Sequence, residues 1–328
     1  MENHVRGSEI VYYLGLDLGG TKTEAAVVDK NGTILSSKRI LTLGEDGPEK
    51  VLKRMCTLIN EVVTEAKLNL ESISGIGMGV PGAVDHSKGN IYFLTNLPGW
   101  TDFPIKDFLT SKYNMTVVLN NDANAAALAE YTFGNGAGTK HIIYLTVSTG
   151  IGGGLIVNGA LFNGAWGAAG EVGHIVLDMD GDECNCGNRG CWETISSGSA
   201  IAKGVINRIK AGEKSKVTEL APLDDIKAEH VFIARAMGDI VSIEVTDRAM
   251  DFLGLGIANL VNVINPEKVI IGGGVAKVGD LLFSRVRERV KSLAYGPASK
   301  VEIQPVYLGT KTGVIGAATL AMVENKDY

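Results

Sequence analysis

Three cysteines near the middle of the chain are spaced for metal binding. Cys184, Cys186 and Cys191 fall within eight residues, and His174 precedes the first of them by ten residues. Three thiolates and one imidazole form a tetrahedral donor set that suits structural zinc. The remaining cysteine, Cys56, stands alone, so the pattern favours a zinc knuckle in a reducing compartment over a disulfide framework.

Glycine-rich turns indicate a second kind of chemistry. The chain has 42 glycines in 328 residues, nearly twice the usual share of about 7%, and they cluster at the ends of predicted strands. Glycines at such places let backbone N–H groups converge on a phosphate. Three turns are therefore candidates for nucleotide binding, through Asp17, Gly19, Gly20, Thr21 and Lys22 in the first, Thr149, Gly150 and Gly152 in the second, and Gly273 and Gly274 in the third.

The first of these turns joins two predicted strands. It is therefore neither a Walker A loop nor a dinucleotide-binding loop, because both need a helix directly after the glycines. Thr21 and Lys22 would add hydrogen-bond donors, and Asp17 could hold Mg²⁺ through water. One such turn by itself could be a plain hairpin. Three of them, two in equivalent places in the two halves of the chain, predict a cleft that binds a nucleotide and its phosphates.

Asp122 is a candidate for acid–base chemistry. It follows Asn121 and opens an alanine-rich segment, predicted to be a helix over 122–133 that Gly134 ends. Phosphoryl transfer to an alcohol needs a group that orients the hydroxyl and accepts its proton. An aspartate in the first turn of a helix also satisfies free N–H groups. From sequence alone the capping role is the better interpretation, although one carboxylate could serve both roles.

The elements around these residues predict an α/β protein made of two related halves. Each half begins with a buried strand, a glycine turn, a second strand and an Asn-Gly hairpin turn, which is a weak internal repeat. We expect two duplicated α/β domains flanking a cleft, a small one over 1–120 plus 313–328 and a large one over 121–312. Strands are predicted at 10–17, 25–29, 33–40, 73–80, 116–119, 141–147, 155–157, 268–275 and 301–308, with helices over 51–63, much of 197–264, and 313–323.

Charge and hydropathy exclude several classes of protein. The net charge is −6, and no segment is rich in lysine or arginine, which argues against a nucleic-acid partner. The first ten residues lack the apolar region of a secretory signal. Residues 142–170 carry no charged side chain, but their glycines and the Asn158-Gly159 turn fit a buried hairpin better than a membrane-spanning helix. We therefore expect a cytoplasmic protein with no membrane partner.

Seven segments together resemble the ROK family (repressor, open reading frame, kinase). That family belongs to the actin/hexokinase-like ATPases, whose domains are ribonuclease H-like. The resemblance extends from about residue 11 to 323 and is greatest to the bacterial ATP-dependent glucokinases. It implies an enzyme of carbohydrate metabolism that phosphorylates glucose to glucose 6-phosphate, with ATP, Mg²⁺ and structural Zn²⁺. The segments are 17–24, 79–85, 121–130, 148–154, 170–174, 184–193 and 271–275.

The resemblance also implies roles for individual residues. Asp122 would be the general base for the O6 hydroxyl of the sugar, and Asn121 would bind neighbouring hydroxyls. His174 would ligate zinc with one ring nitrogen and reach the sugar with the other. Glu171 and Glu193 would bind hydroxyls near the anomeric end. Two further residues are expected to line the same pocket, namely Gly82 and Asn96.

Other members of the family leave alternatives open. A kinase for another hexose or hexosamine (N-acetylmannosamine, N-acetylglucosamine, fructose or allose) would share most of these segments. A sugar-responsive transcriptional repressor is disfavoured, because about ten residues precede the first strand where a helix-turn-helix domain would stand, and because the charge is acidic. An ATP-driven scaffold would leave the predicted sugar and zinc residues without a purpose. The resemblance also implies a homodimer or homotetramer.

Overall fold

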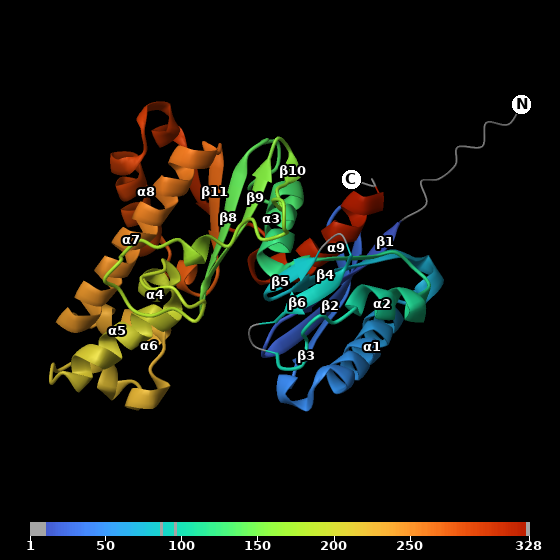
Figure 1. The fold of residues 1–328 in the computed structure, drawn as a ribbon, viewed down its shortest axis with the longest axis horizontal. Helices are drawn as coiled ribbons and strands as arrows, with labels where there is room; N and C mark the ends of the chain where they lie inside the picture. The colour runs from blue at the N-terminus through green and yellow to red at the C-terminus, as the bar shows by residue number, and fades with distance from the viewer. Residues whose placement is uncertain (1–10, 86–87, 95–96, 326–328) are drawn as a thin grey trace, which may run out of the picture. The chain divides into compact units, whose positions relative to one another are not determined.

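The computed structural model describes residues 11–85, 88–94 and 97–325, and the chain divides into two compact units (Figure 1). Unit 1 consists of Met1–Ala137, Asn163–Ala168 and Leu308–Tyr328, and unit 2 of Gly138–Phe162 and Ala169–Tyr307. The domain boundary predicted at residue 120 lies within unit 1, and the division into two functional domains stays a prediction.

Unit 1 is built on a mixed five-stranded sheet with the order β3-β2-β1-β4-β7. The first three strands form an antiparallel meander, whereas β4 and β7 run parallel to β1. The strands are β1 (Tyr12–Leu18), β2 (Lys22–Asp29), β3 (Ile34–Leu41), β4 (Ile73–Val80) and β7 (Val117–Asn121), with a small separate hairpin of β5 (Ala83–Asp85) and β6 (Asn90–Phe93).

Helices cover both faces of this sheet. Helices α1 (Pro48–Glu65) and α2 (Ile105–Tyr113) share a core with the side chains of Leu14, Leu16 and Val27. Helix α9 (Thr312–Asn325) packs on the other face, against Tyr13 and Val28, and next to α3 (Asp122–Phe133). Successive side chains of a strand point to opposite faces of the sheet, so Tyr13 and Leu14, although adjacent in β1, pack in different cores.

Helix α9 approaches the strands so closely that only glycine fits beneath it. A Cβ atom at Gly15 would lie 2.1 Å from the carbonyl oxygen of Val314, and one at Gly77 would lie 1.7 Å from that of Ala317. The C-terminal helix is thereby fixed on the central strands β1 and β4. Its first turn consequently reaches the end of β1, where Asp17 lies.

Unit 2 repeats the sheet of unit 1 in strand order and direction, which confirms the predicted duplication. Its order is β10-β9-β8-β11-β12, with an antiparallel β10-β9-β8 meander followed by two parallel strands. The strands are β8 (Ile142–Val147), β9 (Ile151–Val157), β10 (Ala160–Leu161), β11 (Lys268–Gly272) and β12 (Glu302–Pro305).

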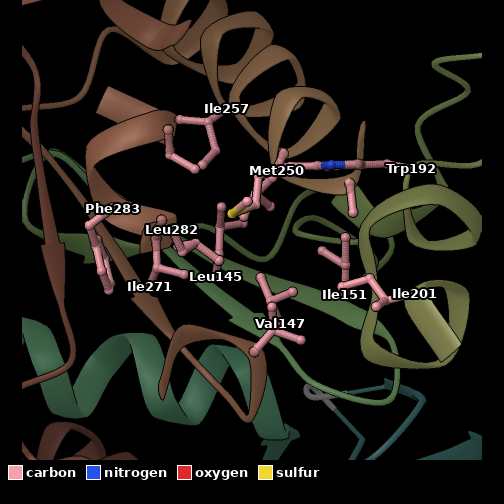
Figure 2. Close-up of a cluster of buried hydrophobic side chains, with 14 of the residues drawn as sticks. Leu145, Val147, Ile151, Trp192, Ile201, Met250, Ile257, Ile271, Leu282 and Phe283 are labelled. Atoms are coloured by element: carbon pink, nitrogen blue, oxygen red, sulfur yellow. The ribbon is translucent and has the colours of Figure 1, made fainter. Parts of the chain in front are cut away.

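The helices of unit 2 build its largest core (Figure 2). Leu145, Val147 and Ile271 from the sheet meet Trp192 and Ile257 in this cluster of buried side chains. The helices are α4 (Glu193–Ser196), α5 (Gly198–Lys210), α6 (Ala228–Ala236), α7 (Ile240–Ile264) and α8 (Asp280–Leu293). Within the described part of the chain, none of the helices combines the length and the apolar character that crossing a bilayer requires.

Candidate functional site

The end of β1 holds a carboxylate in a confined position. Asp17 stands opposite Glu24 in the β1–β2 register, and its Oδ2 atom would lie only 2.4 Å from a Cβ added at Gly313, in the first turn of α9. Burial, and after it the Glu24 carboxylate, raise the pKa of Asp17 to about 6, although the charge of Arg39 acts to lower it. The residue predicted to hold Mg²⁺ is therefore costly to ionise in the folded chain.

The neighbouring carboxylate has two cationic partners. Glu24 has a side chain only 5% exposed, and it accepts a 2.8 Å hydrogen bond from Arg39 Nε and a further one from Lys311 Nζ. Lys311 also donates to Ser37 Oγ at 2.9 Å, so it links the entry of α9 to both β2 and β3. Both cations bond to Glu24, so the charge of this buried carboxylate is compensated. Sequence reasoning missed this network because Lys311 is 287 residues away from Glu24.

The junction of β7 and α3 brings three predicted sugar-binding residues together. Asn121 is the N-cap of α3: its Oδ1 accepts from the Ala123 N–H at 2.8 Å, and its Nδ2 donates to the Gly82 carbonyl at 3.2 Å. Asp122 occupies the first helical position, and its Oδ1 also accepts from Ala123 N at 2.8 Å. The cap predicted at Asp122 is thus centred on Asn121 and shared by Asp122. Asn96, predicted for the same pocket, lies outside the described residues.

The predicted zinc ligands converge in unit 2. The donor atoms of His174, Cys184, Cys186 and Cys191 all lie within 4.8 Å of one another. The Cys186 and Cys191 sulfurs are 3.6 Å apart, as are the Cys184 sulfur and His174 Nδ1. Bonds of about 2.3 Å to a central zinc give tetrahedral edges of about 3.8 Å, so these spacings fit a Zn²⁺ ion.

The chemistry of the thiols also fits a cation. The backbone N–H of Asn188 lowers the pKa of Cys186 to about 7, while burial raises the pKa of Cys191 to about 12. A thiolate at Cys186 would thus be available near neutral pH, and Cys191 would lose its proton when a metal ion binds. His174 presents Nδ1 to this cluster and has Nε2 at 3.9 Å from Glu171.

Glu193 connects the zinc cluster to the second glycine turn. Its Oε2 accepts a 3.2 Å hydrogen bond from the N–H of Ile151, and its Oε1 lies 3.7 Å from the Cys184 sulfur. A Cβ at Gly150 would lie 2.3 Å from Oε2, so a side chain there would displace the carboxylate from its position beside the turn. This second role of Glu193, beside its predicted sugar contact, was not visible in the sequence.

The second glycine turn is shorter than predicted. Ser148 N donates to the Gly150 carbonyl at 2.9 Å, so the turn closes there with Thr149 inside it, and β9 starts at Ile151. Gly152 therefore lies in the strand, paired with Thr146, and not in a loop.

The third glycine turn follows β11. Gly273 has φ +92° and lies where a Cβ would be 2.3 Å from the Val147 carbonyl oxygen. A Cβ at Gly274 would meet only Ser148 Oγ, at 3.7 Å. One side of the backbone at Gly274 is therefore open, as binding of a flat base would require.

These features define an α/β protein whose two repeated five-stranded sheets match those of actin-like nucleotide-binding proteins. The model of the ROK family matches residues 13–324, and the chain belongs to that family. It is 36% identical to a glucokinase of Thermotoga maritima over 318 residues, which cover 94% of this chain and 96% of the relative. It is also 33% identical to a xylose repressor of Caldicellulosiruptor bescii over 283 residues, covering 86% of this chain and 70% of the relative.

A solved structure gives the same relationship in three dimensions. The ROK family glucokinase from Streptomyces griseus, in complex with glucose and AMPPNP, superposes with a TM-score of 0.82 at 33% identity. The match covers 95% of this chain and 99% of that protein. The predicted family and fold class are thereby confirmed.

Proposed function

We propose that the protein transfers the γ-phosphoryl group of ATP to the 6-hydroxyl of a hexose, with glucose as the first substrate to test. The observation that carries this proposal is the likeness to the Streptomyces griseus glucokinase, whose structure contains glucose and an ATP analogue. The glucokinase of Thermotoga maritima adds support over nearly the whole chain. Another hexose or a hexosamine remains the alternative substrate.

Asp122 is the proposed general base. Its carboxylate takes the proton of the sugar O6 hydroxyl as that oxygen forms a bond to the γ-phosphorus, and the bond to the ADP oxygen breaks. Asn121 fixes the start of α3, because its side chain bonds both to Ala123 N and to the Gly82 carbonyl. We propose that Asn121, Gly82, Glu171, His174, Glu193 and Asn96 bind the remaining hydroxyls of the sugar.

The glycine turns are the proposed nucleotide site. Backbone N–H groups of Gly20–Lys22 and of Thr149–Gly150 would bind phosphate oxygens, and the open backbone at Gly274 would lie against the base. Asp17 would hold Mg²⁺ through water, which neutralises charge on the transferring phosphoryl group.

The four ligands of the zinc cluster have a positioning role in this proposal. Zinc, when bound, would fix the orientation and tautomer of His174 and cross-link the loop around it. His174 Nε2 faces Glu171, and Cys184 lies beside Glu193, so the same loop orders both carboxylates. Loss of the metal should therefore weaken sugar binding as well as stability.

Asp122→Asn tests the base. Asparagine keeps an oxygen that can accept from Ala123 N, so the helix should form normally while proton acceptance is lost. We expect kcat to fall roughly 10²- to 10⁴-fold, with glucose affinity by calorimetry within about twofold of the wild type. Asp280→Asn is the matched control, because Asp280 is also the first residue of a helix, α8. Wild-type turnover in Asp122→Asn would remove Asp122 from the base role.

A panel of acceptors tests the substrate. ADP release should be measured for the wild type with glucose, mannose, fructose, allose and the two N-acetylhexosamines. The highest kcat/KM is expected for glucose. Because the chain also resembles a xylose repressor, duplex DNA should be titrated in parallel. Tight DNA binding that weakens steeply with salt, together with no ADP release, would favour the regulator over the kinase.

A further inference from the structure

Thr42 contacts the back of the first glycine turn through its backbone N–H and its hydroxyl. It follows β3 and is 1% exposed. Its N–H donates to the Thr21 carbonyl at 2.9 Å, and its hydroxyl donates to the Gly19 carbonyl at 2.7 Å. Its own carbonyl accepts from Arg54 Nη2 at 2.7 Å, which anchors it to helix α1.

The direction of each hydroxyl proton follows from this arrangement. The Thr42 and Thr23 hydroxyl oxygens are 2.9 Å apart, and either could donate to the other by distance alone. A hydroxyl has a single proton, and the proton of Thr42 is directed at the Gly19 carbonyl. Thr23 must therefore donate to Thr42, and Thr42 to Gly19. Such a chain of hydrogen bonds is polarised in one direction.

The hydrogen bonds from Thr42 to the Gly19 and Thr21 carbonyls determine the direction of two N–H groups in the turn. In a trans peptide unit the C=O and the N–H point in opposite directions. Because the Gly19 carbonyl is directed at Thr42, the N–H of Gly20 is directed away from it. The same holds for the Thr21 carbonyl and the N–H of Lys22. The contacts of Thr42 thus orient two N–H groups together toward the opposite side of the turn.

We propose that Thr42 is a positioning residue for nucleotide binding, which fixes the N–H groups of Gly20 and Lys22 in the orientation that phosphate oxygens require. This inference rests on the proposed ATP-dependent function. Thr42 touches no substrate in this proposal; it acts through the Gly19 and Thr21 carbonyls. With the hydroxyl removed, the peptide unit between Gly19 and Gly20 can rotate. Binding of the nucleotide must then fix its orientation, and the entropy lost in doing so weakens the affinity.

Thr42→Val isolates the hydroxyl, because valine has nearly the same shape and leaves the N–H bond to Thr21 in place. We expect the KM for ATP, and the dissociation constant of Mg²⁺·AMPPNP by calorimetry, to rise about tenfold, as loss of one buried hydrogen bond implies. kcat and the KM for the sugar should stay within about twofold. Thr42→Ser keeps the hydroxyl and should restore nucleotide affinity.

Two controls separate this role from a loss of stability. Thr319 is a fully buried threonine of α9 whose hydroxyl donates to the Ile315 carbonyl at 2.7 Å, so Thr319→Val removes a comparable bond elsewhere in unit 1. Thr23→Val removes the other hydroxyl of the pair and leaves the Thr42 bond to Gly19 intact. Both should lower the melting temperature and leave the KM for ATP unchanged.

A folded Thr42→Val with wild-type affinity for AMPPNP would overturn the inference. If this variant does not fold, Thr42→Cys provides the comparison with Thr42→Ser, since a thiol is a weak donor, and equal affinities would count against us. A wild-type chain that binds no AMPPNP and phosphorylates no sugar would instead refute the proposed kinase function. The two failures are therefore distinguishable.

Discussion

Replacing Asp17 by asparagine should make the protein more stable and less active. The carboxylate lies against the first turn of α9 and faces Glu24 across the β1–β2 hairpin. Ionising it there is unfavourable, because burial removes water and Glu24 has the same charge. Asparagine has nearly the same shape and no charge. The substitution therefore removes the unfavourable ionisation and, with it, the proposed ligand of Mg²⁺.

The size of the effect follows from the pKa of Asp17. Its rise from 3.8 to about 6 corresponds to about 3 kcal/mol at roughly 1.4 kcal/mol per pKa unit. A raised carboxyl pKa means that the folded chain holds the proton more tightly than the unfolded chain does. Stability contributed by this group is therefore present below pH 4 and is lost as the pH rises toward 6. About 3 kcal/mol is an upper limit for the gain, since the asparagine amide is also buried.

Urea unfolding at a series of pH values between 4 and 8 would test this reasoning. The variant and the wild type should be equally stable near pH 4 and diverge up to pH 6, with a plateau of about 2–3 kcal/mol above it. The buried Trp100 of unit 1 provides a fluorescence signal. In Asp29→Asn no gain is expected, because the Asp29 carboxylate accepts from the N–H groups of Asn31 and Thr33 at 2.9 Å each. A gain that is the same at every pH, or none at pH 7, would refute the explanation by ionisation.

Two further perturbations address the metal cluster and the Glu24 network. Cys186→Ser should reduce zinc, measured by mass spectrometry, from about one per chain to well below one, and should lower the melting temperature and the sugar affinity. A wild-type chain that is fully active without metal would contradict the zinc site. Lys311→Met should destabilise the protein by about 1–2 kcal/mol, because it removes a partner of the buried Glu24, whereas Lys38→Met, which breaks the exposed pair with Glu61, should change stability by less than about 0.5 kcal/mol. Equal losses in denaturant unfolding would show that the burial of Glu24 is irrelevant.

Local patterns in the sequence were sufficient to predict much of the fold. Buried apolar segments, the glycine and hairpin turns, and the helix stop at Gly134 correctly predicted β1–β3 and α3. The repeat of strand, glycine turn and strand predicted two related sheets, and the sheets have the same order. The metal cluster was predictable because three of its four ligands lie within eight residues. In each case the residues that determine the feature are close together in the sequence, or the same pattern occurs twice in the chain.

Features that depend on hydrogen bonding between strands could not be predicted in this way. The second glycine turn was expected to include Gly152, but Gly152 pairs with Thr146 in the sheet, since backbone hydrogen bonding decides where a strand begins. Thr42 is a single threonine after a strand, and nothing in its neighbours reveals that Gly19 and Thr21 turn their carbonyls toward it. Both features arise from pairing between strands.

The first glycine turn lies between a set of stabilising hydrogen bonds from Thr42 and a destabilising pair of carboxylates, Asp17 and Glu24. On one side, Thr42 donates hydrogen bonds to the Gly19 and Thr21 carbonyls. The N–H groups of the same two peptide units therefore face the other way, and neither carbonyl is left without a hydrogen bond. On the other side, Asp17 and Glu24 place two carboxylates opposite each other, an arrangement that lowers stability unless cations are near. Arg39 and Lys311 both bond to Glu24, whereas among the described residues it is the charge of Arg39 alone that lowers the pKa of Asp17. Of the two acidic residues, Asp17 is therefore the one that a bound cation would stabilise more, which is the physical reason to place Mg²⁺ there.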